Sequence, residues 1–432
     1  MSKKTLKAIA VLAFLAFLNG NALADNTASS TTNGTGNTSN ITQSGDGQTA
    51  TVTQDGDDNN SDVDQSLLDN TATVDQDGNN NNSLVLQSGI QSGGNTADVT
   101  QIRDNNQSDV LQSGDFNSAT VAQDEDNTSL VDQSGSGNTA NVDQDGNNSV
   151  PPNIENISNI FQSGDDNTAN VWQDDRNLST INQSGSGNLA DVDQTGFGGG
   201  FDDNTSTVDQ SGDDNTASVT QNGNLNISSI AQLGSLNDAT VGQSGTANDS
   251  TVTQFGDSNS ATVDQSGNDN VSTVGQDLSN TASVNQSGNL NNSAVNQTGP
   301  FGAEGNSATV DQSGENNVST INQDGGVTPN GFSFSNTASV DQSGDWNEAT
   351  VSQDDFNDAT VLQTGIGTAL DPNVVTITQF DDNDVAYAEQ NGGEGNSILI
   401  EQGACCSGAS AVNSATAIQT GTFNTTTIIQ TP

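Results

Sequence analysis

Polar and apolar residues alternate along most of the chain within one seven-residue unit, Asn-x-(Ala/Ser)-x-(Val/Ile)-x-Gln. With the closing glutamine as a marker, 33 units run from Gln43 to Gln430. Asn stands six residues before that glutamine in 31 units, and Val or Ile stands two residues before it in 31. A period of two places the four defined positions on one face of an extended chain and the x residues on the other. Each unit therefore predicts a β-strand that ends in a turn.

The four defined positions of each unit are predicted to face inward, and they form the candidate site for structure and self-assembly. In the unit that starts at Asn70, the outward set would be Thr71, Thr73 and Asp75. Strands stacked in register align equal residues into ladders, in which buried amides can bond to one another. The predicted inward ladder includes Asn70, Ala72, Val74, Gln76, Asn215, Ala217, Val219, Gln221, Asn226, Ser228, Ile230, Gln232, Asn237, Ala239, Val241, Gln243, Asn259, Ala261, Val263 and Gln265.

Glycine follows two residues after the unit glutamine in 24 of the 33 units, where the chain must reverse. A residue free to adopt positive φ is favoured there. Of the 32 intervals between successive glutamines, 20 are 11 residues and four are 10. The four short intervals lack this glycine and read Gln-Asp-x-x-Asn, which predicts a second, shorter turn. The predicted turn glycines include Gly212, Gly223, Gly234, Gly245 and Gly256.

The third position of the unit alternates between Ser and Ala without exception through the first 26 units, from Ser39 to Ala338. The true repeat is therefore about 22 residues, with two strands in each turn of a coil. We expect an all-β, cross-β fold, a two-sheet β-solenoid of strand-turn-strand repeats with about 16 rungs. All Ser strands would lie in one sheet and all Ala strands in the facing one. The alternation ends where Ala349 and Ala359 follow Ala338, so we expect the C-terminal quarter to pack differently.

Composition alone would predict disorder, because the chain has 29% hydrophobic residues and a net charge of −50. The periodicity changes that expectation, since a solenoid gains stability rung by rung from neighbour contacts. Longer insertions, such as those that contain Pro151, Pro300 and Pro329, fall between units and interrupt none of them. The last two units close at Gln419 and Gln430, so we expect the last rung to present an open strand edge to another copy.

Residues 1–24 carry the pattern of a secretory signal peptide. Three lysines precede an apolar run from Ala8 to Leu18, and Ala22 and Ala24 supply the small residues of a cleavage site. The apolar run is shorter than the roughly 20 residues that a bilayer helix needs. We expect cleavage near Ala24, a polar N-terminal segment over 25–36 that lacks the unit, and a repeat domain over 37–432.

The charge balance excludes several classes of partner. Loss of the three N-terminal lysines would take the formal charge from −50 to −53 and leave Arg103 and Arg176 as the basic side chains. Nucleic acids and anionic membranes are bound through clustered Lys or Arg, so we expect neither as a partner, and no membrane insertion. The chain has no His, and its acidic residues recur at outward or turn positions. We expect no enzyme activity, no catalytic residue and no cofactor.

The repeated sequence Gln-x-Gly-x-x-Asn-x-Ala-x-Val-x-Gln, as in Gln210 to Gln221 and Gln265 to Gln286, resembles the curlin repeat of the curli subunits. The resemblance covers about residues 37–432. It implies export through an outer-membrane pore and polymerisation on the bacterial surface into amyloid fibres for biofilm matrix, adhesion and aggregation. The familiar subunits look like about five repeats, whereas this chain has about 16 and a more acidic surface. Major subunit, nucleator and a distinct long member of the family all stay open.

Other chemistry in the sequence leaves weaker alternatives. Stacked carboxylates could bind Ca²⁺, although a solvated acidic surface that keeps the chain soluble during export is the favoured interpretation. Outward Thr pairs such as Thr49 and Thr51 resemble the ladders of ice-binding solenoids but are interrupted. Cys405 and Cys406 are adjacent in a loop, which favours neither an internal disulfide nor a zinc site. The outward carboxylates that directly precede a unit glutamine include Asp64, Asp75, Asp132, Asp143, Asp209, Asp264, Asp311 and Asp341.

The leading interpretation is therefore a secreted, cell-surface, curli-like amyloid subunit that assembles end to end with itself. Other curli-like subunits and a secretion pore would be its further partners, and no metal site is assigned. The alternative is a monomeric secreted β-solenoid, which would act as an adhesin stalk or as an ice-binding or Ca²⁺-dependent surface module.

Overall fold

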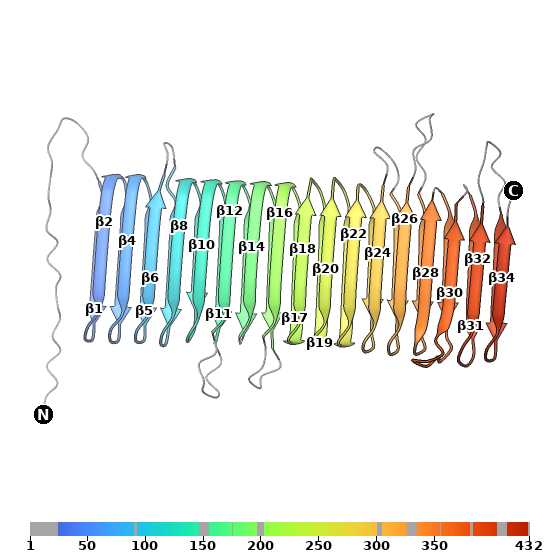
Figure 1. The fold of residues 1–432 in the computed structure, drawn as a ribbon. Coiled ribbons are helices and arrows are strands. Elements are labelled where there is room, and N and C mark those ends of the chain that lie inside the picture. Colours follow the sequence, from blue (N-terminus) through green and yellow to red (C-terminus); the bar gives the residue numbers. More distant parts are fainter. Residues whose placement is uncertain are drawn as a thin grey trace, which may run out of the picture. The chain divides into compact units, whose positions relative to one another are not determined.

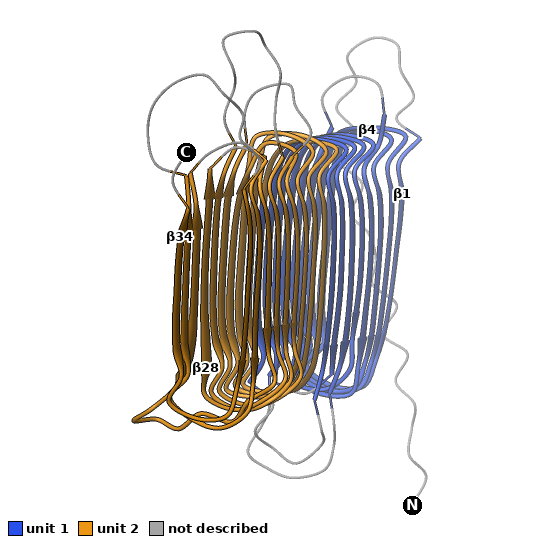
Figure 2. Ribbon diagram, turned by 90° about the vertical axis from the view of Figure 1, so that its right-hand side faces the viewer, with its two compact units in different colours: residues 1–209 blue, residues 210–432 orange. Residues whose placement is uncertain are grey.

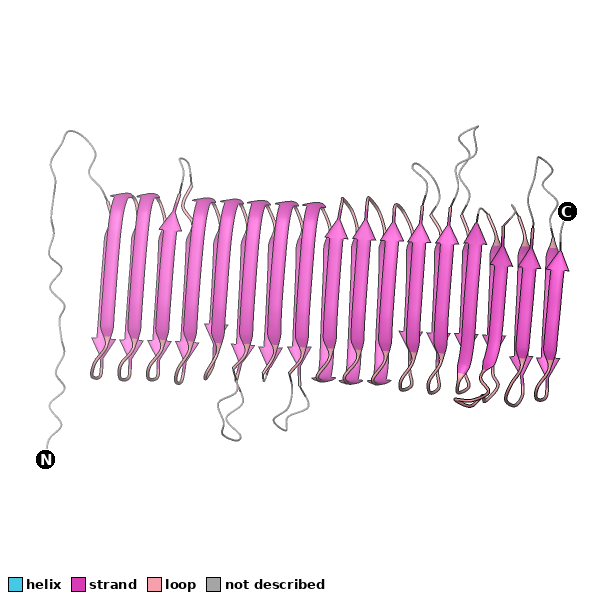
Figure 3. Ribbon diagram, in the orientation of Figure 1, coloured by secondary structure: helices cyan, strands magenta, loops and turns pink. Residues whose placement is uncertain are grey.

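The computed structural model describes residues 25–89, 93–146, 155–174, 176–196, 203–299, 305–325, 335–354, 356–380, 383–403 and 413–430. These residues contain 34 strands and no helix (Figure 3). Within the same ranges, no helix of the length and apolarity required to cross a membrane is found. The predicted signal peptide and the two cysteines lie outside the described residues, as do the prolines of the three insertions named above.

The chain divides into two compact units, residues 1–209 and 210–432, coloured separately in Figure 2. In each unit the strands alternate between two sheets, with odd-numbered strands in sheet A and even-numbered strands in sheet B. Figure 1 labels strands of both sheets. Strand β16 (Thr205–Asp213) contains the boundary between the units.

The strands of unit 1 in sheet A are β1 (Thr27–Asn33), β3 (Thr49–Asp55), β5 (Thr71–Asp77), β7 (Thr96–Ile102), β9 (Ser118–Gln123), β11 (Thr139–Asp145), β13 (Thr168–Asp174) and β15 (Leu189–Thr195). Those in sheet B are β2 (Thr38–Asp46), β4 (Asn60–Leu68), β6 (Asn82–Ser88), β8 (Gln107–Asp115), β10 (Thr128–Ser136), β12 (Ile157–Asp165) and β14 (Leu178–Ser186).

The strands of unit 2 in sheet A are β17 (Thr216–Asn224), β19 (Asp238–Thr246), β21 (Ser260–Asn268), β23 (Thr281–Gln286), β25 (Ser307–Gln312), β27 (Thr337–Gln342), β29 (Asp358–Gln363), β31 (Val385–Asn391) and β33 (Ser414–Thr420). Those in sheet B are β18 (Ile227–Leu233), β20 (Asp249–Phe255), β22 (Val271–Asp277), β24 (Asn292–Thr298), β26 (Val318–Asp324), β28 (Asn347–Asp354), β30 (Asn373–Gln379), β32 (Ser397–Gln402) and β34 (Thr425–Gln430).

Strands pair in parallel with the strand two further along the chain, and equal positions of the unit lie side by side. In sheet A, Ala217 of β17 aligns with Ala239 of β19, and in sheet B, Ser228 of β18 aligns with Ser250 of β20. The predicted fold is thereby confirmed: two parallel sheets form a β-solenoid with a repeat of about 22 residues and about 16 turns. Ser strands and Ala strands lie in separate sheets, because two strands complete one turn of the coil.

The segment 25–36, which we expected to lack the unit, contains strand β1, Thr27–Asn33. In its pairing with β3, Ser30 aligns with Val52 and Thr32 aligns with Gln54. The segment thus adds a strand to sheet A, with Ser and Thr where the next strand carries Val and Gln. The sequence pattern did not reveal this strand, because only the Asn and the Ala of the seven-residue unit remain, at its first and third positions.

The C-terminal quarter keeps both sheets and their register, contrary to the expectation of a different arrangement. Ala349 of β28 aligns with Ser319 of β26, and sheet A retains Ala at the third position as far as β33. The core composition does change. Sheet B carries Val375 and Ile398 at the third position, and sheet A carries Ala388 and Ala417 at the fifth, all buried. Volume added to one sheet is offset in the other, the kind of exchange that close-packed cores tolerate best.

Candidate self-assembly site: stacked amide columns

All twenty residues predicted for the inward ladder are buried, with at most 2% of any of them exposed. The burial pattern of the strands alternates residue by residue, as in β5 and β17. Val or Ile and the small third residue form the apolar centre between the sheets. Asn and Gln lie inside at the two ends of each strand, so the cost of burying their amides depends on their hydrogen bonds.

Within each of the two compact units, the glutamines that close the seven-residue repeats form one continuous hydrogen-bonded column in each sheet. Gln54 Nε2 donates to Gln76 Oε1 of the next strand in sheet A at 2.9 Å. The same nitrogen donates to the backbone oxygen of Thr38, in the preceding strand of sheet B, also at 2.9 Å. Gln232 repeats this pattern in unit 2, towards Gln254 and Thr216. Both amide hydrogens of Gln54 and of Gln232 are used, so each of these glutamines bonds along its own sheet and across to the other.

The unit asparagines hold the turns. Asn237 donates its backbone N–H to Asn215 Oδ1 of the preceding coil at 3.0 Å, and its own Oδ1 accepts the backbone N–H of Asn259 of the following coil at 3.0 Å. Its Nδ2 donates to the backbone oxygen of Gly256, in the turn of the following coil, at 2.8 Å. Asn237 thereby joins three successive coils of unit 2. This explains why Asn237 tolerates burial: its donors and its acceptor are all paired.

The predicted turn glycines all have positive φ, from 76° at Gly256 to 133° at Gly223. A second constraint acts on them, because equal turns stack at the spacing of strands. A Cβ atom on Gly212 would lie 1.9 Å from the backbone oxygen of Gly234, and one on Gly223 would lie 2.0 Å from that of Gly245. No side chain fits at those distances, so stacking as well as conformation requires glycine.

Six stretches of the chain match the family model of the curlin associated repeat: residues 34–66, 69–102, 159–196, 212–245, 245–277 and 335–365. The chain belongs to the curlin-repeat family. The matches fall in both units and include the Asn and Gln columns described above. No curated protein sequence matches the chain significantly. The family and the solenoid fold are structural, and the family is one of extracellular, curli-related proteins.

One turn position of this curlin-repeat protein was missed by sequence reasoning. The residue directly before the unit Asn has positive φ in both types of turn, including bulky residues such as Phe116 at 60° and Leu236 at 59°. In the short turns Arg176 and Phe356 hold the same conformation, at 53° and 56°. Asn, Asp and Gly are frequent at this position, which is the signal that could have revealed it. Leu, Phe and Trp at some turns hide that signal.

Sheet B of the curlin-repeat coil contains a row of buried hydroxyl groups that have no hydrogen-bond partner. They belong to the third-position serines, among them Ser228, Ser250 and Ser272. A buried polar atom left unpaired costs about 1–3 kcal/mol. Serine there is small enough for close sheet packing, but Ala, which occupies the same position in sheet A, would be small enough too. We have no structural account of why sheet B uses Ser.

The outward carboxylates form rows along the sheets, and burial alters some of them. Partial burial raises the pKa of Asp143 and Asp193, and it raises the pKa of Asp341 together with the neighbouring charge of Asp311. Asp311 and Asp341 lie side by side on β25 and β27. Within the described ranges, no group of three or more His, Cys, Asp or Glu residues is arranged to hold a metal ion.

The last described strand shows which groups one end of the coil presents. Among the described strands, β34 pairs with β32 alone. Gln430 Nε2 donates to the backbone oxygen of Ser414 at 3.0 Å, whereas glutamines inside the column donate twice. The inward Ile428 of β34 is half-buried. The outward Ile429 of the same strand is 60% exposed. This end therefore presents a donor from the glutamine column beside an apolar side chain.

The first described strands present the complementary groups. Gln43 of β2 donates to Gln65 Oε1 at 2.9 Å, and no donor among the described residues reaches its own Oε1. In sheet A, Gln54 Oε1 is buried without a partner, because β1 carries Thr32 where the column would continue. The glutamine columns thus run in one direction, with acceptors at the N-terminal end and donors at the C-terminal end.

Proposed function

We propose that this curlin-repeat protein is the subunit of an extracellular, curli-like amyloid fibre that serves biofilm matrix, surface adhesion and aggregation. Export would follow cleavage of residues 1–24, through an outer-membrane pore. The observation that carries the proposal is the direction of the glutamine columns. Strand β34 offers Gln430 Nε2 as a donor, and strand β2 offers Gln43 Oε1 as an acceptor, both in sheet B.

A second copy completes both ends. Continued stacking would pair β33 with β1 and β34 with β2 of the next copy, so that the register of the coil is preserved. Asn424 Oδ1 would then accept the backbone N–H of Asn37, as Asn396 Oδ1 accepts that of Asn424 within one chain at 3.1 Å. Strand edges that meet in this way gain a full set of backbone hydrogen bonds, which is the physical basis of fibre growth.

The test compares two neighbouring substitutions on the same strand. In Ile428→Asp a carboxylate would enter the buried side of the junction, whereas in Ile429→Asp it would stay on the outer face. Purified residues 25–432 are followed by thioflavin T fluorescence and electron microscopy. We expect Ile428→Asp to lengthen the lag by about tenfold or more, since an unpaired buried charge is costly. Ile429→Asp should change it less than twofold.

Two outcomes would contradict the proposal. Unsubstituted protein that stays monomeric for days without fibres would favour the alternative of a monomeric adhesin stalk or surface module. Equal lags for the two variants would show that β34 does not form the junction. An ice-binding module gains little support from the structure, because the Thr ladder that runs through Thr51 and Thr73 meets Asp98 on the next strand of sheet A.

A further inference from the structure

One tryptophan stands on the outer face of sheet A in unit 1, between two carboxylates. Trp172 of β13 aligns with Asp143 of β11 on one side and with Asp193 of β15 on the other. The indole is 45% exposed. The residue that aligns with Asp143 on its other side is Ala122 of β9, whose side chain is small. One row of this face therefore contains the small side chain of Ala122, the indole of Trp172 and the two carboxylates that flank the indole.

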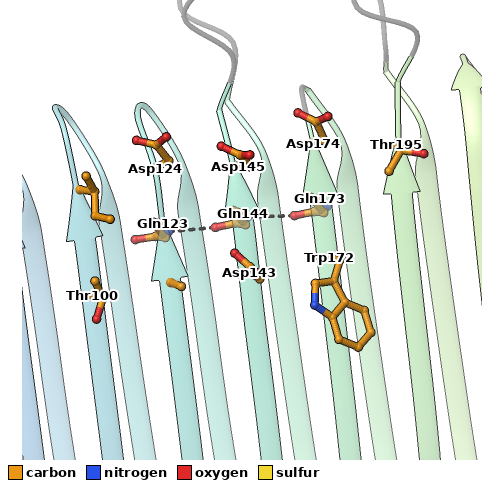
Figure 4. A pocket seen from close by; sticks show the side chains of 12 residues that line it. Thr100, Gln123, Asp124, Asp143, Gln144, Asp145, Trp172, Gln173, Asp174 and Thr195 are labelled. Atoms are coloured by element: carbon orange, nitrogen blue, oxygen red, sulfur yellow. Dashed lines mark hydrogen bonds between the residues drawn. The ribbon is translucent and has the colours of Figure 1, made fainter.

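Ala122, Asp143 and Trp172 border a hollow of about 340 Å³ on the sheet surface, whereas Asp193 lies outside its lining (Figure 4). Figure 4 shows Asp124, Asp145 and Asp174 in a second row at the strand ends, above the row that contains Asp143 and Trp172. Between the two rows lies the glutamine column, whose amides are already bonded to one another, as in the 2.9 Å bond from Gln144 to Gln173. The groups left to meet a ligand are an indole face and carboxylates.

Negative charge at the hollow exceeds the positive charge that the chain itself can place there. Burial raises the pKa of both Asp143 and Asp193, so their ionised forms are less well solvated than free carboxylates. Arg103 lies near the hollow, but it pairs with Asp124 at 2.5 Å. The whole chain has 5 basic residues against 55 acidic ones, so basic side chains of its own are too few to neutralise this face.

We infer that the hollow at Trp172 binds the guanidinium group of an arginine side chain from an extended basic peptide. A guanidinium stacks flat on an indole and bonds to carboxylates at its edge. Trp172 and Asp143 border the hollow, and Asp193 flanks the indole on its other side. An uncharged sugar could stack on the ring but would leave the carboxylates uncompensated. A metal ion would gain no ligand from the indole. This inference does not depend on fibre assembly.

The binding test uses Trp172 as its own reporter. The chain has two tryptophans, and Trp346→Phe leaves one. That substitution is conservative, because Trp346 has φ 54° at the turn position directly before the unit Asn. Phe116 and Phe356 adopt a similar φ at the same position of two other turns. Tetra-arginine is titrated into the freshly purified full chain, and the indole emission is recorded. We expect a saturable change in emission.

Two matched pairs of substitutions separate a site from general charge attraction. Asp143→Asn with Asp193→Asn removes the carboxylates beside the indole, and Asp311→Asn with Asp341→Asn removes an equal charge from an aligned pair elsewhere in sheet A. Asn already occupies this outward position at Asn285, so the substitutions fit the strand. Because the guanidinium would lose the charged acceptors beside the indole, the first pair should weaken binding about tenfold. The second pair should weaken it less than twofold.

Equal weakening by the two pairs would overturn the inference, because binding would then follow total charge. An equal emission change with cellotetraose, in place of tetra-arginine, would also overturn it and would assign the hollow to carbohydrate. No change in emission with tetra-arginine at any accessible concentration would show that the guanidinium does not reach the indole.

Discussion

At the scale of single residues, the stacking of turns makes individual glycines indispensable. Gly212 has φ 113°, and a Cβ atom there would meet the backbone oxygen of Gly234 at 1.9 Å. Gly242 is a suitable control, because it lies on the outer face of β19 and its nearest neighbour would be a side-chain atom of Asp264 at 3.7 Å. The same change, glycine to alanine, should therefore have opposite consequences at the two positions.

We expect Gly212→Ala to lower the free energy of unfolding by about 1–3 kcal/mol or more, the cost of backbone strain together with displacement of the next turn. Gly242→Ala should be neutral or slightly stabilising, since it restricts the unfolded chain without a clash. Urea unfolding followed by circular dichroism measures both. Equal destabilisation would mean that the stacked turns adapt more readily than their spacing suggests.

At the scale of strands, the buried serines of sheet B predict an unusual gain in stability. Ser228, Ser250 and Ser272 lie side by side on β18, β20 and β22, and their hydroxyls have no partner. Replacement of all three by Ala removes unpaired polar atoms, and Ala349 already occupies this position on β28. We expect each replacement to stabilise by about 1 kcal/mol or more, measured by urea unfolding. The outward Ser229→Ala should change little, and a loss of stability in the triple variant would indicate hydroxyl bonds in solution.

At the scale of the whole molecule, the acidic surface makes stability depend on pH. The raised pKa values of Asp143, Asp193 and Asp341 mean that their protonated forms are favoured by folding. The stability that they contribute is complete below the ordinary value of 3.8 and is lost as pH rises through the folded-state pKa. Asp57, whose pKa is lowered by hydrogen bonds from Thr35, acts in the opposite direction but is fully exposed.

The urea midpoint should therefore be higher at pH 4 than at pH 7. Salt should raise the midpoint more at pH 7 than at pH 4, because it screens carboxylates only while they are ionised and more of them are ionised at pH 7. A variant with Asn at 143, 193 and 341 should show a smaller difference between the two pH values. A midpoint that falls on acidification would contradict the assignment of these carboxylates as destabilising.

The sequence by itself determined the strands, the inward and outward faces and the separation of Ser and Ala strands into two sheets. Each follows from local periodicity, since a residue's face depends on its position in the strand and its sheet on the parity of the unit. Only the tertiary structure showed that β1 joins the coil with Ser30 and Thr32 in place of Val and Gln. It also revealed the direction of the glutamine columns, the volume exchange between sheets and the hollow beside Trp172. These three features depend on which residues from different turns of the coil lie side by side. The residue pattern within one seven-residue unit does not specify those neighbours.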